Sequence, residues 1–185
     1  MSKTSIYLTL IIITIFILLN SLFTMNEREQ GLVLQFGEPK RVVKSSGLHF
    51  KLPLIQNVIR YDRRILEYDL PVEEVIAVDK KRMLIDSFTR FKITDPLEFY
   101  KTVGNEINVR NRLNSNVISS LRRVVGRVTL DELLSQERSN IMENIKVEVN
   151  NEAFRFGIEI VDVRIRRADL PEANSQAIYE RMISE

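Results

Sequence analysis

The sequence predicts an α+β protein in three parts: an N-terminal transmembrane helix in residues 1–25, a mixed α+β domain in residues 26–170, and the start of a long C-terminal helix in residues 171–185. Three observations support this prediction. An uncharged apolar run opens the chain, apolar residues then alternate at a period of two, and in the second half they recur every three or four residues. The length of 185 residues corresponds to about one domain.

The composition narrows the classes of function. Lys and Arg number 27 and Asp and Glu 25, and this near-balance argues against a nucleic-acid binder. The chain has no cysteine, one histidine and no tryptophan, which excludes disulfide frameworks, thiol nucleophiles and cysteine-based zinc sites. Hydrophobic residues make up 44% of the chain, enough to form a core.

The first segment has the length and composition of a membrane span. Lys3 and Glu27 bracket a stretch without charge, and its most apolar part covers residues 6–24. A helix of that length is about 28 Å long, close to the roughly 30 Å of a hydrocarbon core. Thirteen of its residues are Ile, Leu or Phe, and each contributes about −0.3 to −0.6 kcal/mol to insertion. The residues predicted to span the membrane include Ile6, Leu10, Ile13, Ile17 and Leu22.

A cleaved signal peptide is the alternative for this segment. The apolar region of a signal peptide is about 7–15 residues long and ends in small residues. This run is longer, and residues 20–23 (NSLF) make a poor cleavage site. An uncleaved anchor is therefore the favoured interpretation.

Charge alone leaves the orientation of the span open. Lys3 precedes the span, and several cations follow it. They include Arg28, Lys40, Arg41 and Lys44. A count of these cations would place the domain in the cytoplasm, but long domains translocate largely regardless of flanking charge.

The first half of the domain is predicted to form β-strands. Residues 31–36 are a β-rich run, and Leu48, Phe50 and Leu52 alternate with polar residues, which is the period of a half-buried strand. Further strands are predicted in residues 58–70, 72–78 and 83–93, with a hairpin tip at 79–82. The face of the last strand that is expected in the core carries Met83, Ile85, Ser87, Thr89, Phe91 and Ile93.

The second half has helical periodicity. Asp95 followed by Pro96 predicts the start of a short helix that ends near Val103. An apolar stripe predicts a longer helix in residues 107–126. The apolar residues that fall three or four apart after Ile107 are Leu113, Val117, Leu121, Val124, Val125 and, just beyond the expected helix end near Gly126, Val128.

Two more helices are predicted before the last strand. Residues 129–132 (TLDE) have the spacing of a capping box, so a short helix begins there. Apolar residues recur at helical spacing through residues 141–156, and Gly157 ends that helix.

The last strand and the last helix complete the pattern. Residues 158–165 are β-rich, and their apolar positions change parity between Ile160 and Val161, which indicates a bulge. A final helix is predicted to begin at Pro171 and still continues at Glu185. We therefore expect that the chain is truncated within a longer helix.

The sequence predicts no catalytic, cofactor-binding or metal site. His49 is the only imidazole and is expected to be structural, no serine lies in a G-x-S-x-G turn, and the glycines are not spaced to bind a phosphate. The densest cationic positions are Arg122, Arg123, Arg164, Arg166 and Arg167. They form either a solvated face or a charged seam against a neighbouring subunit or lipid headgroups.

Three motifs resemble one family. They are residues 26–37 (NEREQGLVLQFG), residues 47–55 (GLHFKLPLI) and residues 157–166 (GIEIVDVRIR). Together they resemble the SPFH or band 7 superfamily, which includes stomatin, prohibitin, flotillin and HflK/C. Residues 177–182 (AIYERM) favour the HflC branch, as do residues 79–100. One departure is Ser46, where the family usually has proline.

The resemblance implies a non-catalytic scaffold without a cofactor, anchored in the bacterial inner membrane. It implies assembly with an HflK-like subunit and association with the membrane protease FtsH, whose choice of membrane substrates the assembly modulates. It also implies a cytoplasmic N-terminus and a periplasmic domain, followed by a long coiled-coil helix. Two other hypotheses are a stomatin- or prohibitin-like organiser of membrane proteins and lipids, with its domain in the cytoplasm, and a membrane peptidase.

Overall fold

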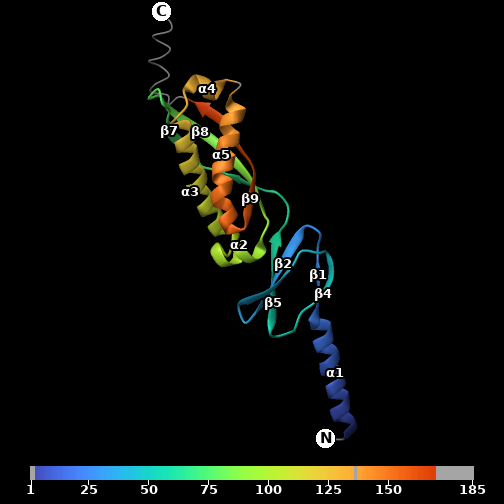
Figure 1. The fold of residues 1–185 in the computed structure, drawn as a ribbon. Helices are drawn as coiled ribbons and strands as arrows, with labels where there is room; N and C mark the ends of the chain where they lie inside the picture. Colours follow the sequence, from blue (N-terminus) through green and yellow to red (C-terminus); the bar gives the residue numbers. More distant parts are fainter. Residues whose placement is uncertain (1–2, 136, 170–185) are drawn as a thin grey trace, which may run out of the picture. The chain divides into compact units, whose positions relative to one another are not determined.

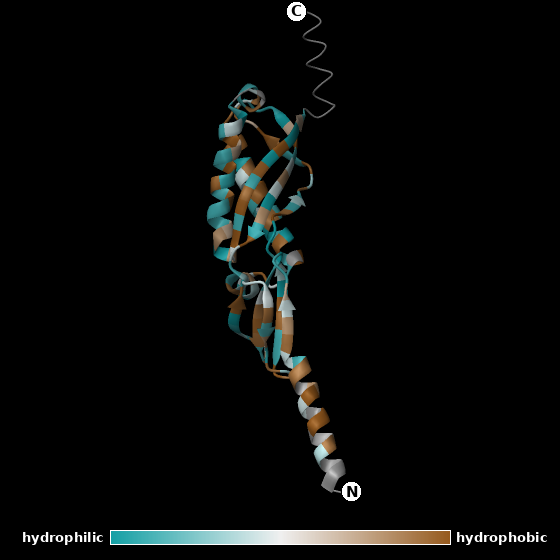
Figure 2. Cartoon of the chain, turned by 90° about the vertical axis from the view of Figure 1, so that its right-hand side faces the viewer, coloured by the Kyte–Doolittle hydropathy of each residue, from teal (hydrophilic) through white to brown (hydrophobic). Residues whose placement is uncertain are grey.

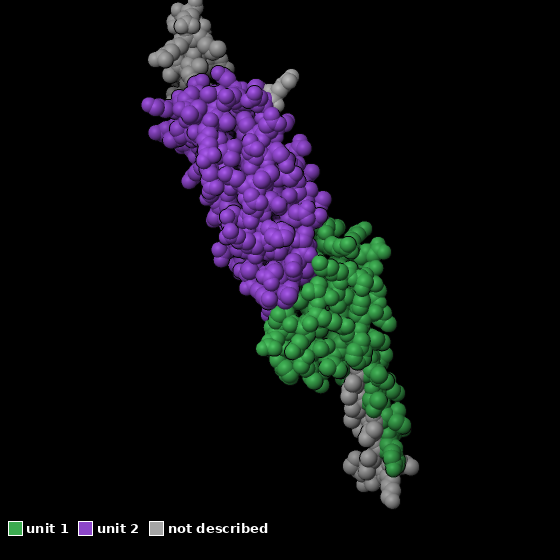
Figure 3. Space-filling view, in the orientation of Figure 1, with its two compact units in different colours: residues 1–64 green, residues 65–185 purple. Residues whose placement is uncertain are grey.

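The computed structural model describes residues 3–135 and 137–169, which divide into two compact units. Figure 3 shows unit 1, Met1–Arg64, and unit 2, Ile65–Glu185. The predicted final helix lies outside the described residues. The domain predicted in residues 26–170 contains a boundary after Arg64 that the sequence pattern does not indicate.

Unit 1 consists of one helix and five short strands (Figure 1). They are α1 (Lys3–Ser21), β1 (Leu22–Met25), β2 (Glu29–Gln35), β3 (Glu38–Val43), β4 (Gly47–Phe50) and β5 (Gln56–Asp62). Strand β2 is central in an antiparallel sheet of order β3-β2-β5, and β1 pairs with β4 in a separate antiparallel ribbon. A small core joins the two, formed by Phe23, Met25, Val33 and Val43 with Val58 packed against them.

Unit 2 is a layer of helices on one face of an antiparallel sheet (Figure 1). Its elements are β6 (Leu66–Asp69), β7 (Glu73–Ile76), β8 (Arg82–Ile93), α2 (Pro96–Thr102), α3 (Glu106–Val125), α4 (Leu130–Leu134), α5 (Arg138–Ala153), the 3₁₀ turn η1 (Phe154–Phe156) and β9 (Ile158–Asp169). The twelve-residue β8 organises the sheet because β9 pairs along one edge while β6 and β7 share the other.

The core of unit 2 follows the predicted periodicities. Every residue of the predicted inner face of β8, from Met83 to Ile93, is buried. Helix α3 buries a stripe that includes Leu113, Val117 and Leu121, and α5 buries the stripe that begins at Ile141. Strand β9 has the predicted bulge, because Phe91 of β8 pairs with Ile160 while the preceding residue, Arg90, pairs with Asp162, so that Val161 is skipped.

Side-chain caps set the helix ends where the sequence places them. The Asp95 carboxylate accepts hydrogen bonds from the N–H groups of Leu97 and Glu98, which begins α2. Thr129 and Glu132 form the predicted capping box at α4. Gly157 ends the last helical turn at a φ of 69°, and a Cβ there would lie 2.4 Å from the carbonyl oxygen of Asp95. Only glycine fits this position.

The strand predicted in residues 58–70 is two strands. It is interrupted after Asp62, whose carboxylate accepts hydrogen bonds from the backbone N–H of Arg64 at 2.8 Å and from its guanidinium. This Asp side chain offers the backbone an alternative to the sheet ladder. The interruption coincides with the boundary between the units, since Arg64 is the last residue of unit 1.

Candidate functional site

Helix α1 presents large apolar side chains that the described part of the chain leaves uncovered. Figure 2 shows the apolar colouring along this helix. The following side chains are each more than half exposed: Tyr7, Leu8, Ile11, Ile12, Ile15, Phe16, Leu18 and Leu19. Among the described residues, no helix combines the length and the apolar character needed to cross a membrane.

The residues predicted to span the membrane divide between two elements. Ile6, Leu10, Ile13 and Ile17 lie on α1, and their side chains are outside the described set. The helix ends at Ser21 rather than at the end of the apolar run. Leu22 therefore belongs to strand β1, where it is 48% exposed.

The end of α1 is fastened to the end of β4. The backbone N–H of Lys51 donates to the carbonyl oxygen of Ser21 at 2.7 Å. The Ser21 hydroxyl donates in turn to the carbonyl oxygen of Lys51, also at 2.7 Å, and Ser21 is buried. This reciprocal pair satisfies a carbonyl group at the helix C-terminus that would otherwise have no partner within the helix.

The β1–β4 ribbon has one buried face and one exposed face, and both are apolar. Phe23 and Met25 point into the core, whereas Leu22, Leu48 and Phe50, here called the apolar face, are 48%, 64% and 52% exposed. Leu22 lies directly opposite Phe50 in the ribbon, so their side chains are cross-strand neighbours. The expectation that Leu48 and Phe50 occupy the inner side of a half-buried strand is therefore wrong.

The half-buried member of strand β4 is His49. It lies opposite Phe23, with ring centroids 5.6 Å apart, and its Nε2 is 2.9 Å from the carbonyl oxygen of Ser45. Both contacts are within unit 1 and agree with a structural role, which stays a prediction.

Two turns of unit 1 carry exposed apolar residues in unusual backbone conformations. Phe36, in the two-residue β2–β3 turn, is 82% exposed with a φ of 53°, and Leu54, in the β4–β5 turn, is fully exposed with a φ of 68°. The N–H of Phe36 donates to the carbonyl oxygen of Ile55 at 3.4 Å, so the turns are neighbours. We call Phe36, Leu54 and Ile55 the turn tips. Figure 1 shows both turns at the end of unit 1 from which α1 extends.

Phe36 and Leu54 combine an exposed apolar side chain with a left-handed backbone conformation, and both features are unfavourable in water. A left-handed conformation costs a residue with a side chain about 1–2 kcal/mol, and type I′ hairpin turns prefer Asn or Gly where Phe36 stands. Such outliers persist mainly at functional sites. Together with the apolar face, the turn tips are the strongest candidate contact surface of unit 1.

The cationic clusters of the sequence are paired within unit 2. The pairs are Arg122–Glu73 at 2.9 Å, Arg123–Glu148 at 3.4 Å, Arg164–Asp162 at 2.6 Å, Arg166–Glu67 at 3.6 Å and Arg167–Asp169 at 3.5 Å. Their exposed side chains favour the interpretation as a solvated, internally balanced face.

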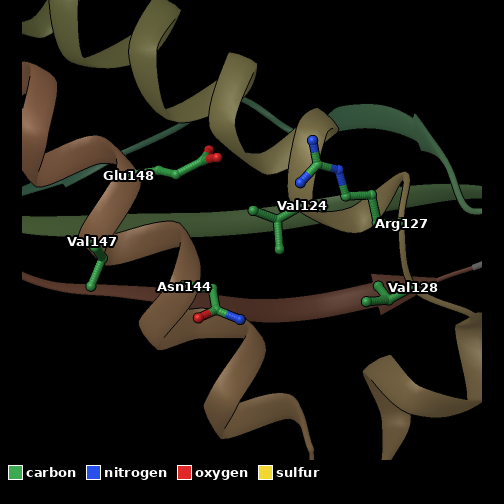
Figure 4. Close-up of a pocket in the computed structure, with 6 residues that line it drawn as sticks. All are labelled: Val124, Arg127, Val128, Asn144, Val147 and Glu148. Carbon is green, nitrogen blue, oxygen red and sulfur yellow. The ribbon is translucent and has the colours of Figure 1, made fainter.

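Unit 2 also has a shallow hollow between α3 and α5, of about 380 Å³ (Figure 4). Its lining is Val124, Arg127, Val128, Asn144, Val147 and Glu148. Its charged residues are Glu148 and Arg127, and the six lining residues do not combine a nucleophile with a general base. Within the described residues, no group of His, Asp and Glu side chains is arranged to hold a metal ion.

The family model for the SPFH domain / Band 7 family matches residues 23–185, which is most of the chain. The chain belongs to this family. The match begins within β1 and covers both units, so the boundary after Arg64 lies inside the SPFH domain.

Several curated relatives of this SPFH chain are named HflC. Protein HflC of Haemophilus influenzae is 33% identical over 90% of this chain, and Protein HflC of Buchnera aphidicola from Acyrthosiphon pisum is 31% identical over 91%. The protein of Escherichia coli K12 that is named Modulator of FtsH protease HflC is 28% identical over 96% of this chain. These alignments cover 60%, 62% and 67% of the relatives, so the chain spans about three fifths of their length.

Proposed function

We propose that this SPFH chain is a non-catalytic scaffold anchored in the bacterial inner membrane by its amino-terminal apolar run. Its N-terminus lies in the cytoplasm and its SPFH domain in the periplasm. There it assembles with an HflK-like subunit and modulates proteolysis by an FtsH-like membrane protease. The modulating role is carried over from the name of the Escherichia coli relative.

The observation that supports the proposed membrane anchor is that the described apolar side chains of α1 are exposed. Its described apolar side chains cover about half of the helix circumference, and the sequence places Ile6, Leu10, Ile13 and Ile17 on the other half. A helix that is hydrophobic all round is stable when buried in a protein or in lipid. No other described element covers α1, which supports lipid as its surroundings.

The turn tips and the apolar face extend the same argument beyond the helix. Burying a Leu or Phe side chain contributes about 1.5–3 kcal/mol. Phe36 and Leu54 forgo this contribution in water, at the end of unit 1 from which α1 extends. We propose that the turn tips enter the bilayer surface beside α1, with Leu22, Leu48 and Phe50 next to them.

The first experiment determines topology. A reporter enzyme that is active only in the periplasm is fused after Glu185 and compared with a second reporter that is active only in the cytoplasm. Periplasmic activity is expected. Cytoplasmic activity would contradict the proposed orientation and favour the stomatin- or prohibitin-like organiser.

The second experiment determines partners. The chain is extracted in mild detergent at native expression and affinity-purified, and HflK-like and FtsH-like proteins are expected in the eluate. A monomer without either protein would contradict the scaffold. Cleavage of casein by the purified chain, abolished by a single serine substitution, would contradict the non-catalytic part of the proposal.

A further inference from the structure

Three cationic residues of unit 1 lie on or next to the strands β3 and β4, and two of them are linked to the end of α1. They are Lys40 and Arg41 on β3 and Lys51 just after β4, and we call them the basic rim. The Arg41 guanidinium donates to the carbonyl oxygen of Phe50, a member of the apolar face. The next residue is Lys51. Its backbone N–H donates a hydrogen bond to the carbonyl oxygen of Ser21, the last residue of α1, and its carbonyl oxygen accepts one from the Ser21 hydroxyl. Two of these residues are therefore held at the helix end, Arg41 through its guanidinium and Lys51 through its backbone.

The basic rim has no partner of opposite charge within the described residues. Elsewhere in unit 1, Arg60 is paired with Glu29 and Arg64 with Asp62. Lys40, Arg41 and Lys51 form no ion pair among the described residues, although Glu38 lies on the same strand as Lys40. The Arg41 fork has five N–H donors, and the described contacts use one of its nitrogens, on the Phe50 carbonyl.

The charge of the chain is divided unequally between the units. Residues 1–64 contain nine Lys and Arg against four Asp and Glu, a formal charge of +5. Residues 65–185 contain eighteen against twenty-one, a formal charge of −3. The excess of positive charge thus lies in the unit that also exposes α1, the apolar face and the turn tips.

We propose that the basic rim binds the phosphate groups of anionic phospholipids. This inference rests on the proposed function, because an inserted α1 places its last residue at the edge of the hydrocarbon. The headgroup layer there is about 5–8 Å thick on each side. Arg41 and Lys51 are fastened at that level, and long cationic side chains keep their stems along apolar surface while the charge reaches polar groups. A guanidinium fork matches the geometry of two phosphate oxygens.

The alternative occupant of a basic surface is an acidic protein segment. The apolar neighbours of the basic rim favour lipid, because a cation beside Phe50 and Leu22 matches the junction of a headgroup with its acyl chains. Surface cations near an anionic membrane each strengthen binding about fivefold.

The test measures which lipids border the protein. The full chain is reconstituted in phosphatidylcholine bilayers with a trace of spin-labelled phosphatidylglycerol or spin-labelled phosphatidylcholine, and the motionally restricted fraction is read by electron spin resonance. A preference for phosphatidylglycerol of about fivefold or more is expected. The double variant Arg41→Gln with Lys51→Gln should reduce the preference to nearly one. The matched control, Lys80→Gln with Arg110→Gln in unit 2, removes the same charge and should preserve the preference.

Two further measurements separate the possible outcomes. Arg41→Lys keeps the charge and should retain most of the preference, and raising salt from about 50 mM to about 500 mM should diminish the wild-type preference severalfold. Free inorganic phosphate at millimolar concentration should not compete, which separates a lipid headgroup from a soluble phosphate.

An inserted chain without a preference for phosphatidylglycerol overturns this inference alone. If the double variant misfolds, a wild-type preference that salt leaves unchanged overturns it. Salt-sensitive self-association that requires Arg41 and Lys51, without lipid preference, assigns the basic rim to a protein partner and also overturns it. A chain that does not insert at all contradicts the proposed function itself.

Discussion

Units 1 and 2 treat their apolar and charged residues in opposite ways. Unit 2 buries its apolar stripes between α3, α5 and the sheet, and it pairs most of its cations with carboxylates within the unit. Unit 1 has a small core, exposes the apolar side chains of the apolar face and the turn tips, and leaves the basic rim without a carboxylate partner among the described residues. Unit 2 also exposes single apolar side chains such as Ile107 and Phe154, so the difference lies in the size of the core and in the pairing of charges, and it supports the proposed membrane contact of unit 1.

The largest expected effect tests the closed core of unit 2. Leu121→Asp places a charge where α3 packs on the sheet, at a position that is 2% exposed. We expect a loss of about 4 kcal/mol or more in the free energy of unfolding, because a buried carboxylate lacks a partner there. Urea denaturation measures the change. Val147→Asp on α5, at a position that is 52% exposed, is the matched control and should change stability by about 0.5 kcal/mol or less.

The next effect tests the proposed anchor. Ile13→Arg lies near the middle of the apolar run and should cost about 3 kcal/mol of insertion free energy, which displaces much of the protein from membranes. Fractionation of cells measures the displacement, with Ile13→Leu as the control. If the arginine variant fractionates like the wild type, the amino-terminal run is not the anchor.

A third experiment asks whether the turn tips enter lipid. Because the chain lacks tryptophan, Leu54→Trp introduces a single probe at a fully exposed position. Its fluorescence should shift to the blue and be quenched by brominated lipids, as expected for an indole at the membrane interface. Val147→Trp in unit 2 is the control and should stay unquenched. Equal fluorescence of the two probes would remove the distinction between the units.

A fourth experiment tests the turn chemistry of unit 1. Phe36→Asn supplies the residue that a type I′ turn prefers at this φ. The stability of the protein in detergent should rise by about 1 kcal/mol, while quenching of the Leu54→Trp probe in bilayers should fall. A loss of stability would show that Phe36 packs within the protein.

The smallest effect concerns Asp62 at the boundary between the units. The Arg64 hydrogen bond lowers the pKa of Asp62 below its ordinary 3.8, against the opposing effect of burial. A depressed folded-state pKa means that the stabilisation is fully present above the unfolded pKa and is lost as pH falls through the folded one. Wild-type protein and Asp62→Asn should therefore differ in urea stability at neutral pH, and the difference should shrink as the pH falls below 3.8 and through the lowered folded-state pKa. If the two proteins still differ in stability in acid, the effect comes from the shape of the Asp62 side chain rather than from its charge.

Sequence periodicity predicted unit 2 far better than unit 1. The inner face of β8, the α3 stripe, the bulge after Ile160 and the capping box at Thr129 are all confirmed, because each depends on packing or hydrogen bonding within the chain. Cap and bulge signals are local, and a stripe that faces a protein core has one possible direction.

The same reasoning was wrong for strand β4 of unit 1. Leu48 and Phe50 alternate as a buried face does, yet they are exposed and His49 is the inward residue. Alternation shows that one face is apolar without showing what covers it. The split of the strand after Asp62 was also missed, because an aspartate that bonds the N–H two residues on has no hydrophobic signature.

The direct passage from α1 into β1 has a mechanical consequence. Ser21 ends the helix and Leu22 begins the strand, so no loop separates them, and the two hydrogen bonds to Lys51 brace the joint from the side. A helix joined to a strand in this way lacks a flexible linker about which it could rotate. Any twist of α1 about its long axis is therefore passed on as a turn of the β1–β4 ribbon.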